Sequence, residues 1–179
     1  MNDIKNYSAR ETLKNGLEVT IRAITPNDRE EFLAAFKGLE DRSLYYRFFS
    51  PKTRLSDKEL TAAVEVDFVK TVALVTCVKD KDVEKIIGGG RYIVFGKADP
   101  PDKAEVAFMV EEDYQGCGIA SRILKHLAGI ATEKGIKEFH ADVLADNTGM
   151  LNVFKRCDFS MKQSYESGVA HVILSLSGH

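Results

Sequence analysis

Apolar residues in the first third of the chain follow two different periods. In residues 17–24 they alternate with polar residues, as on a half-buried strand. In residues 25–38 they recur at helical spacing after an early proline, and the run gives way at a glycine. Residues 56–66 begin with Ser56 three positions before Glu59, the arrangement of a capping box. The pattern predicts a strand followed by two helices.

The central third predicts three consecutive strands and then a helix. Two runs rich in β-branched residues, 71–78 and 85–95, flank a charged turn and predict a hairpin. Residues 104–110 form the next apolar run, and residues 119–134 then carry an apolar stripe at helical spacing that Gly135 ends. The remaining predicted elements are a strand (139–144), a helix (147–156) and a closing hairpin (159–165 with 169–176).

This order predicts an α/β fold of the mixed α+β kind, with a mostly antiparallel sheet of about seven strands flanked by helices. Only the strand-helix-strand unit at residues 104–144 requires a crossover, and therefore one parallel pair of strands. The glycines at 88–90 lie inside a predicted strand, where they indicate a bulge or the close approach of another element rather than a phosphate site.

Length and composition indicate how many domains the chain forms. The chain has 179 residues, of which 44% are hydrophobic and 29% charged, enough for one domain with a proper core. We therefore expect a single domain over residues 1–179, with residues 1–14 and 175–179 loosely ordered because they are polar.

Charge and cysteine content narrow the partners and the compartment. A formal net charge of −2 provides no overall basic field, so nucleic acid is not an expected partner. Cys77, Cys117 and Cys157 are odd in number and widely spaced, which predicts neither disulfides nor a metal site and favours a reducing compartment. No apolar run approaches the length of a membrane span and no export signal is visible, so we expect a cytoplasmic protein that does not bind membranes.

The most informative local feature is the glycine loop from Gln115 to Ala120, which reads Gln-Gly-Cys-Gly-Ile-Ala between a predicted strand and a predicted helix. Glycines allow a ligand to approach the backbone, and the free N–H groups of a helix N-terminus favour an anion. The spacing matches neither a Walker loop nor a dinucleotide-binding fingerprint. On these residues alone, a phosphate site and a tight turn without a ligand both stay open.

The residues around this loop resemble the GNAT superfamily of N-acetyltransferases. Glu105-Val-Ala-Phe-Met-Val110 precedes the loop, and Asn147 and Phe154-Lys-Arg-Cys-Asp-Phe159 follow it. The acyl-CoA signature of that family is Gln/Arg-x-x-Gly-x-Gly/Ala, which Gln115, Gly118 and Ala120 match. The resemblance implies a GNAT fold in which the parallel pair of strands splays apart at the acyl-CoA site.

Two segments of the N-terminal half resemble the bacterial protein lysine acetyltransferases in particular. These are Arg22-Ala-Ile-Thr-Pro-Asn-Asp28 and Ser43-Leu-Tyr-Tyr-Arg-Phe-Phe49. By this resemblance Tyr45, Tyr46 and Arg47 lie where such enzymes form the acceptor groove, although aromatic residues around an arginine also suit plain packing.

The resemblance implies acetyl-CoA as co-substrate and assigns its contacts. The pyrophosphate would lie on the backbone of Gln115, Gly116, Cys117, Gly118, Ile119, Ala120 and Ser121. Main-chain groups of Met109 and Val110 would bind pantetheine, with the Val110 N–H as oxyanion donor. Asn147 would contact the pantetheine arm, or would act only as a helix N-cap.

The expected general base is Glu105, the only ionisable residue between Ala104 and Val110. The lysine acetyltransferases that this chain resembles have their catalytic glutamate here, and burial would suit that role. The alternative is a carboxylate on a solvated sheet face. Phe154 stands where many GNAT enzymes have a tyrosine acid, so water, unassisted departure of the thiolate or Tyr165 must take its place.

These residues predict transfer of an acetyl group from acetyl-CoA to a primary amine by direct attack in a ternary complex. The favoured acceptor is an exposed lysine of a protein, with acyl-CoA synthetases among the candidates. A small-amine acetyltransferase acting on a polyamine, amino acid or antibiotic would have the same donor site. A non-catalytic acyl-CoA sensor is the alternative from a different class, since Phe154 cannot donate a proton.

Overall fold

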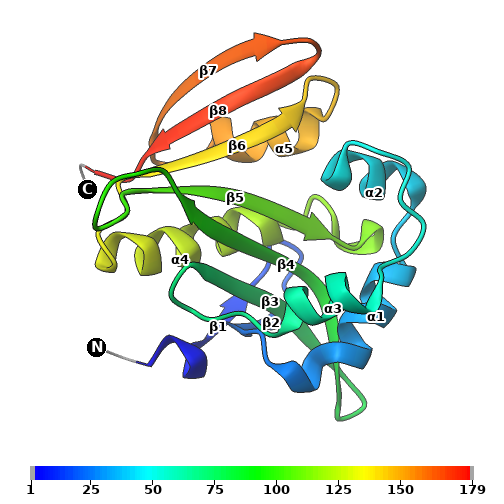
Figure 1. The fold of residues 1–179 in the computed structure, drawn as a ribbon. Coiled ribbons are helices and arrows are strands. Elements are labelled where there is room, and N and C mark those ends of the chain that lie inside the picture. Colours follow the sequence, from blue (N-terminus) through cyan, green and yellow to red (C-terminus); the bar gives the residue numbers. More distant parts are fainter. Residues whose placement is uncertain (1–2, 178–179) are drawn as a thin grey trace.

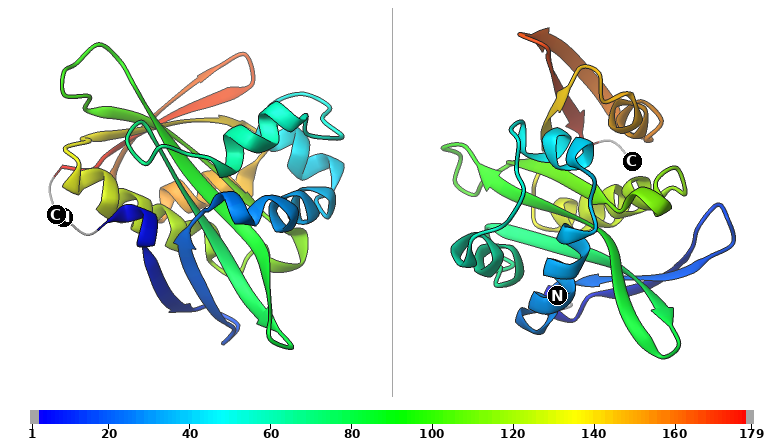
Figure 2. Two further views of the ribbon diagram at one scale, coloured as in Figure 1. Left: turned by 60° about the horizontal axis from the view of Figure 1, so that its bottom comes forward. Right: turned by 90° about the vertical axis from the view of Figure 1, so that its right-hand side faces the viewer.

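The computed structural model describes residues 3–177, which form one mixed sheet with helices on both faces (Figures 1 and 2). Neighbouring strands lie in the order β1-β2-β3-β4-β5-β6-β8-β7, and only β5 and β6 are parallel. The strands are β1 (Ser8–Thr12), β2 (Glu18–Ala23), β3 (Thr71–Asp80), β4 (Val83–Phe95), β5 (Lys103–Val110), β6 (Glu138–Leu144), β7 (Ser160–Glu166) and β8 (Val169–Ser175). The α-helices are α1 (Arg29–Lys37), α2 (Asp41–Phe48), α3 (Asp57–Val64), α4 (Ile119–Glu133) and α5 (Thr148–Lys155).

The predicted mixed fold is confirmed, together with its single parallel pair, both hairpins and the capping box at Ser56. The predicted loose order of residues 1–14 is wrong for the described part, since residues 4–6 form a 3₁₀ turn and β1 pairs along its whole length with β2. Residues 1–2 and 178–179 lie outside the described residues, and Leu176 near the other end is buried. The sheet therefore has eight strands, not seven.

The central strand β3 is buried on both faces because both carry helices. Val72 and Leu74 belong to the cluster that packs against α4, whereas Ala73 and Val75 belong to a second cluster beneath α1 and α3. Successive strand residues point to opposite faces, so a continuous apolar run is the signature of such a strand. The two faces of the sheet are thus separate environments.

Helix α4 lies unusually close to β4, and the glycines of that strand permit it. A Cβ atom on Gly90 would lie 2.6 Å from Ile123 Cγ2 of the helix and 2.7 Å from Phe108 Cδ1 of β5. The pairing of β3 with β4 also shifts between Thr76 and Cys77, opposite the start of this glycine run. The predicted bulge and close approach are both confirmed, and the helix N-terminus is held against the sheet.

The parallel pair of strands is short. Its register covers only Lys103 with Glu138, Ala104 with Phe139, and Glu105 with His140. Beyond this point β5 continues to Val110 while β6 turns away toward α5, and Figure 1 shows the two strands diverging. One edge of β5 is therefore unpaired where a functional site is expected.

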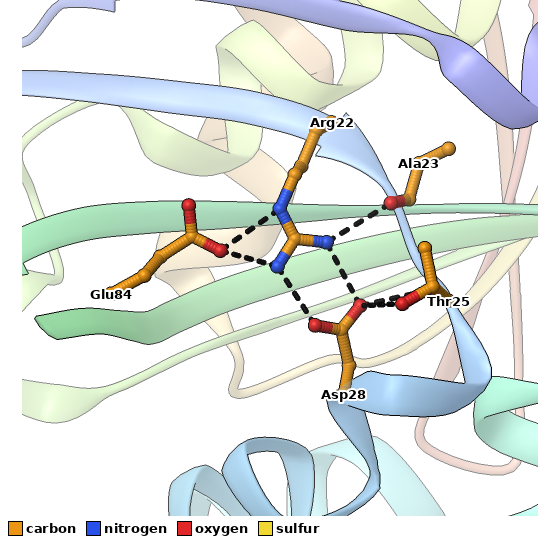
Figure 3. A network of polar contacts seen from close by, with 5 residues as sticks. All are labelled: Arg22, Ala23, Thr25, Asp28 and Glu84. Atoms are coloured by element: carbon orange, nitrogen blue, oxygen red, sulfur yellow. Dashed lines mark hydrogen bonds and ion pairs between the residues drawn. The ribbon is translucent and has the colours of Figure 1, made fainter.

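A partly buried ion-pair network fixes the first α-helix to the sheet (Figure 3). Arg22 of β2 makes two hydrogen bonds of 2.8 Å to Asp28, which precedes α1, and also contacts Glu84 of β4. Asp28 in turn accepts a bond of 2.8 Å from the Thr25 N–H. The motif shared with lysine acetyltransferases thus contains a structural clamp rather than a catalytic group.

Candidate active site

The unpaired edge of β5 presents main-chain groups of alternate residues. The Glu111 N–H donates to Ile87 O of β4, so odd-numbered residues of β5 direct their main-chain groups toward β4. Phe108 and Val110 consequently direct theirs to the opposite side, from which β6 has diverged. Of the pair Met109 and Val110, only Val110 presents its N–H to this opening, while Met109 faces β4.

The glycine loop lies beside this edge and leads into a long helix. Gly116 and Gly118 have φ values of +79° and +90°, in the left-handed region that other residues avoid. Helix α4 begins directly afterwards at Ile119 and runs for 15 residues. The loop therefore places the free N–H groups of a helix N-terminus next to the open strand edge.

A cavity of about 600 Å³ joins these two features. Its wall includes β5 from Val106 to Val110, the start of α4, β6 from Ala141 to Val143, and residues of α2 and α5. Its basic lining residues are Lys14, Arg42, Arg47 and Arg156. Its acidic lining residues are Glu40, Glu112, Asp142 and Asp146, so the lining has no excess of positive charge. An elongated ligand whose anionic group lies at the helix N-terminus fits this cavity beside the open strand edge.

Gln115 links three parts of the site. Its side-chain amide donates to Val110 O at 3.1 Å and to Ser43 Oγ of α2 at 3.2 Å. The glycine loop, the end of β5 and α2 are therefore held together by one side chain. This contact could not be predicted from the sequence, because Ser43 precedes Gln115 by 72 positions.

Lys14, for which the sequence predicted no role, lines the cavity, whereas the expected site residue Cys117 does not. The Asn15 amide donates to the Cys117 sulfur at 3.5 Å, and Cys117 is the one residue of 115–121 that does not line the cavity. Lys14, in the turn between β1 and β2, lines the cavity and binds the loop through its own N–H to Cys117 O at 3.2 Å. Lys14 lies in the segment that we expected to be loosely ordered, so the sequence provided no indication of this role.

Asn147 is the N-cap of α5, with its side-chain oxygen accepting from the Met150 N–H at 3.2 Å. It also lines the cavity opposite β5. The cap fixes the side chain at the mouth of the opening between β5 and β6. Capping and a ligand contact are thus compatible at this position.

Glu105 lies on the face of β5 opposite to Val106, and its side chain is exposed. The burial that would favour a base is not present in this structure. Two half-buried arginines, Arg47 of α2 and Arg91 of β4, are its charged neighbours on this face. Burial, and then the nearby Arg91, lower the pKa of Arg47 to about 10, while Glu105 acts in the opposite direction. Burial also lowers the pKa of Arg91, again opposed by Glu105.

The residues considered as proton donors lie in different places. Phe154 is buried and packs on Phe108 with ring centroids 6.1 Å apart, so it belongs to the core. Tyr165 is 59% exposed on the outer strand β7. Tyr46 and Tyr114 are the tyrosines that line the cavity. Tyr46 already accepts from Arg42 at 2.9 Å and donates to Asp146 O at 3.3 Å.

Comparison with known proteins agrees with this site. The profile of the acetyltransferase (GNAT) family matches residues 39–159. Acetyltransferase PA5475 of Pseudomonas aeruginosa is 25% identical over 140 residues, which are 78% of this chain and 74% of that protein. Acetyltransferase Pat of Mycolicibacterium smegmatis is 31% identical over 136 residues, covering 76% of this chain but only 39% of Pat. The matched region is therefore less than half the length of Pat.

Among solved structures, the GNAT domain of S. lividans PAT superimposes with a TM-score of 0.85 and 36% identity, covering 94% of this chain and 96% of that one. The strand edge opened beside a glycine-led helix is the arrangement that the resemblance to acyl-CoA-dependent transferases implies. The profile match makes the assignment specific: the chain belongs to the GNAT family of acetyltransferases. It is an acetyl-CoA-dependent N-acetyltransferase, and its likeness to the Pat enzymes, expected from the sequence, is confirmed. Within residues 3–177 no helix is long and apolar enough to cross a membrane.

Proposed function

We propose that this enzyme acetylates the ε-amine of lysine on a protein in the cytoplasm, with Glu105 as general base. The observation that carries the proposal is the position of Glu105 on the exposed face of β5, one residue before the strand edge opens. A protein-borne lysine can reach such a position from solvent. The likeness to S. lividans PAT and to Pat of M. smegmatis supports the same reading.

The residues present fit acetyl-CoA as the donor. The backbone of Gln115 to Ser121 would hold the pyrophosphate, while Phe108 and Val110 offer main-chain groups to pantetheine as an added strand would. A similar fold is known with its cofactor acetyl-CoA, in yncA of Salmonella typhimurium, at a TM-score of 0.69 and 17% identity. Bound in the donor cavity of this chain, acetyl-CoA would supply the activated acetyl group.

The protein would contribute two functions from different points along β5, since Glu105 precedes Val110 by five residues and does not line the donor cavity. The Val110 N–H, aimed at the opening, would stabilise negative charge on the thioester oxygen as the amine attacks. Glu105, directly or through water, would take the proton of a lysine whose ordinary pKa is about 10.4. Departure of the CoA thiolate would be unassisted or assisted by water, because Phe154 is apolar and Tyr165 lies away from the cavity.

The test compares the wild type with Glu105→Gln on purified proteins that include an acyl-CoA synthetase, and separately on a panel of small amines. We expect lysine acetylation, detected by mass spectrometry, to fall at least about a hundredfold in Glu105→Gln, the size of a general-base contribution. Glu18→Gln, an exposed carboxylate on β2, is the matched control. Turnover only on small amines would reject the protein acceptor, and CoA binding without turnover on either panel would reject catalysis.

A further inference from the structure

A second cavity lies on the other face of β4 and β5, under α1, α2 and α3. Its volume is about 290 Å³, and its wall is mostly apolar. Residues 107–109 of β5 line both this cavity and the donor cavity, as does Arg47. The two spaces are therefore neighbours across one strand, and Arg47 lies at their junction.

The cavity has two arginines that form no ion pair, and the carboxylate of Glu105 is the anionic charge that acts on both of them. Its charged lining residues are Arg47, Glu59, Arg91 and Glu111. Glu59 is bonded to Lys52 at 2.5 Å, and Glu111 to Lys85 at 3.1 Å. Within residues 3–177 no ion pair or hydrogen bond joins Arg47 or Arg91 to any other side chain; Arg47 only lies over the Phe48 ring, 5.0 Å from its centre. The two acids of the cavity wall are thus paired with lysines and not with the two arginines.

Two half-buried guanidinium groups that act on each other electrostatically are costly. Each loses hydration, and each repels the other, as the lowered pKa of Arg47 reflects. The Arg22 network of the same chain shows the usual solution, in which carboxylates satisfy a half-buried arginine. Here two arginines face one carboxylate, that of Glu105, and neither forms an ion pair with it, so a second carboxylate that arrives with a ligand would explain the pair.

The register of the sheet sets how far this pair lies from the reaction. Arg91 is paired with Ala107, and Ile93 with Glu105, so Arg91 and Glu105 are diagonal neighbours on one face. Such neighbours lie about 7–8 Å apart, and their Cβ atoms are somewhat closer. A group bound by Arg91 would therefore lie within a residue or two of an amine held at Glu105.

Resting on the proposed function, we propose that Arg47 and Arg91 form a subsite for a carboxylate of the acceptor, namely an acidic side chain flanking the target lysine. Guanidinium groups bind carboxylates through paired, charge-assisted hydrogen bonds. The acceptor is the favoured source of the carboxylate because the subsite shares its sheet face with Glu105. The enzyme would thus select lysines in acidic sequence contexts.

The test uses two peptides with one central lysine, flanked on both sides by Glu in one peptide and by Gln in the other. We expect the wild type to favour the acidic peptide in kcat/KM by about tenfold to a hundredfold, as a charge-assisted hydrogen bond would provide. In Arg91→Gln and in Arg47→Gln that ratio should fall to about one. The matched control is Arg10→Gln, an exposed arginine on the edge strand β1, in which the ratio should persist.

Each other outcome has a defined meaning. A ratio near one in the wild type, or a ratio that both variants retain, overturns the subsite. An arginine-dependent preference for succinyl-CoA over acetyl-CoA would move the carboxylate to the donor and overturn its assignment to the acceptor. If neither peptide is acetylated, the proposed function fails, and the subsite is judged alone by titrating glutarate against the Nε–H NMR signals of Arg47 and Arg91. Absence of any shift there rejects it.

Discussion

Substituting alanine for either glycine of the loop tests whether the loop geometry serves the donor. Gly116 and Gly118 both have φ in the left-handed region, but their surroundings differ. A Cβ on Gly116 meets no atom within 4 Å, whereas a Cβ on Gly118 would lie 2.5 Å from Arg122 Nη1. Arg122 cannot move freely, because it donates to Gly118 O at 3.2 Å and to Thr12 O at 2.6 Å.

The expected magnitudes follow from these two environments. A left-handed conformation costs a residue with a Cβ about 1–2 kcal/mol, so Gly116→Ala should lose that amount. Gly118→Ala should lose about 1 kcal/mol more, since Arg122 must give up a hydrogen bond. If the loop keeps its shape, the loss appears in the free energy of unfolding. If the loop relaxes in the free protein, the loss appears in CoA affinity, at tenfold in Kd for about 1.4 kcal/mol.

The assay therefore measures both quantities, unfolding by urea titration and CoA binding by calorimetry, and adds the two losses for each variant. We expect sums of about 1–2 kcal/mol for Gly116→Ala and about 2–3 kcal/mol for Gly118→Ala. Two variants indistinguishable from the wild type in both measurements would refute the reasoning. So would a larger loss in Gly116→Ala than in Gly118→Ala.

Three further predictions concern buried groups. Burial alone would raise the pKa of Asp28, but hydrogen bonds from Arg22 and Thr25 hold it below the ordinary value. Asp28→Asn should therefore lower the free energy of unfolding at pH 7 by about 3 kcal/mol, as urea titrations would measure. This loss of stability relative to the wild type should shrink as the pH falls below about 5, because the wild-type carboxylate is then protonated. A loss that does not change with pH would argue against the ion pair. The buried hydroxyl of Tyr92 lacks a hydrogen-bond partner within residues 3–177, so Tyr92→Phe should raise the melting temperature by about 2–4 °C. A lower melting temperature in the variant would show that the hydroxyl is hydrogen-bonded. Burial raises the pKa of Cys77 to about 12, so this thiol should resist maleimide in the native protein and react only on unfolding, as peptide mapping would show.

Much of the fold could be predicted because its signals are local. The apolar stripe of α4, the both-face burial of β3 and the capping box at Ser56 each arise from residues close in sequence. The strand β1 gave no such signal, since an edge strand pairs through its backbone and its side chains here are half exposed. The other edge strand, β7, was predicted as part of a hairpin, so the missing signal is particular to β1.

The helix α2 was also missed, because its aromatic residues suit a strand or a packed loop as well as a helix. Its contribution to the site depends on tertiary contacts, such as Ser43 with Gln115 and Tyr46 with Asp146. The proximity of Arg47 to Arg91 likewise depends on tertiary structure, since the two residues come from different elements. Spacing along the chain carries no information about such neighbours.

The open edge of β5 has a consequence for the solubility of the protein. Unpaired strand edges invite other chains to add strands, which is a common route to aggregation. Here the free edge lies inside the sheet rather than at its border, with β6 continuing on its other side and α2 and α5 lining the same cavity. Another polypeptide strand, with side chains on both faces, would collide with these walls, whereas a slender unbranched chain would not. The cavity therefore leaves the unpaired main-chain groups of β5 accessible to a thin ligand, and we expect it to prevent strand addition by other copies of the chain.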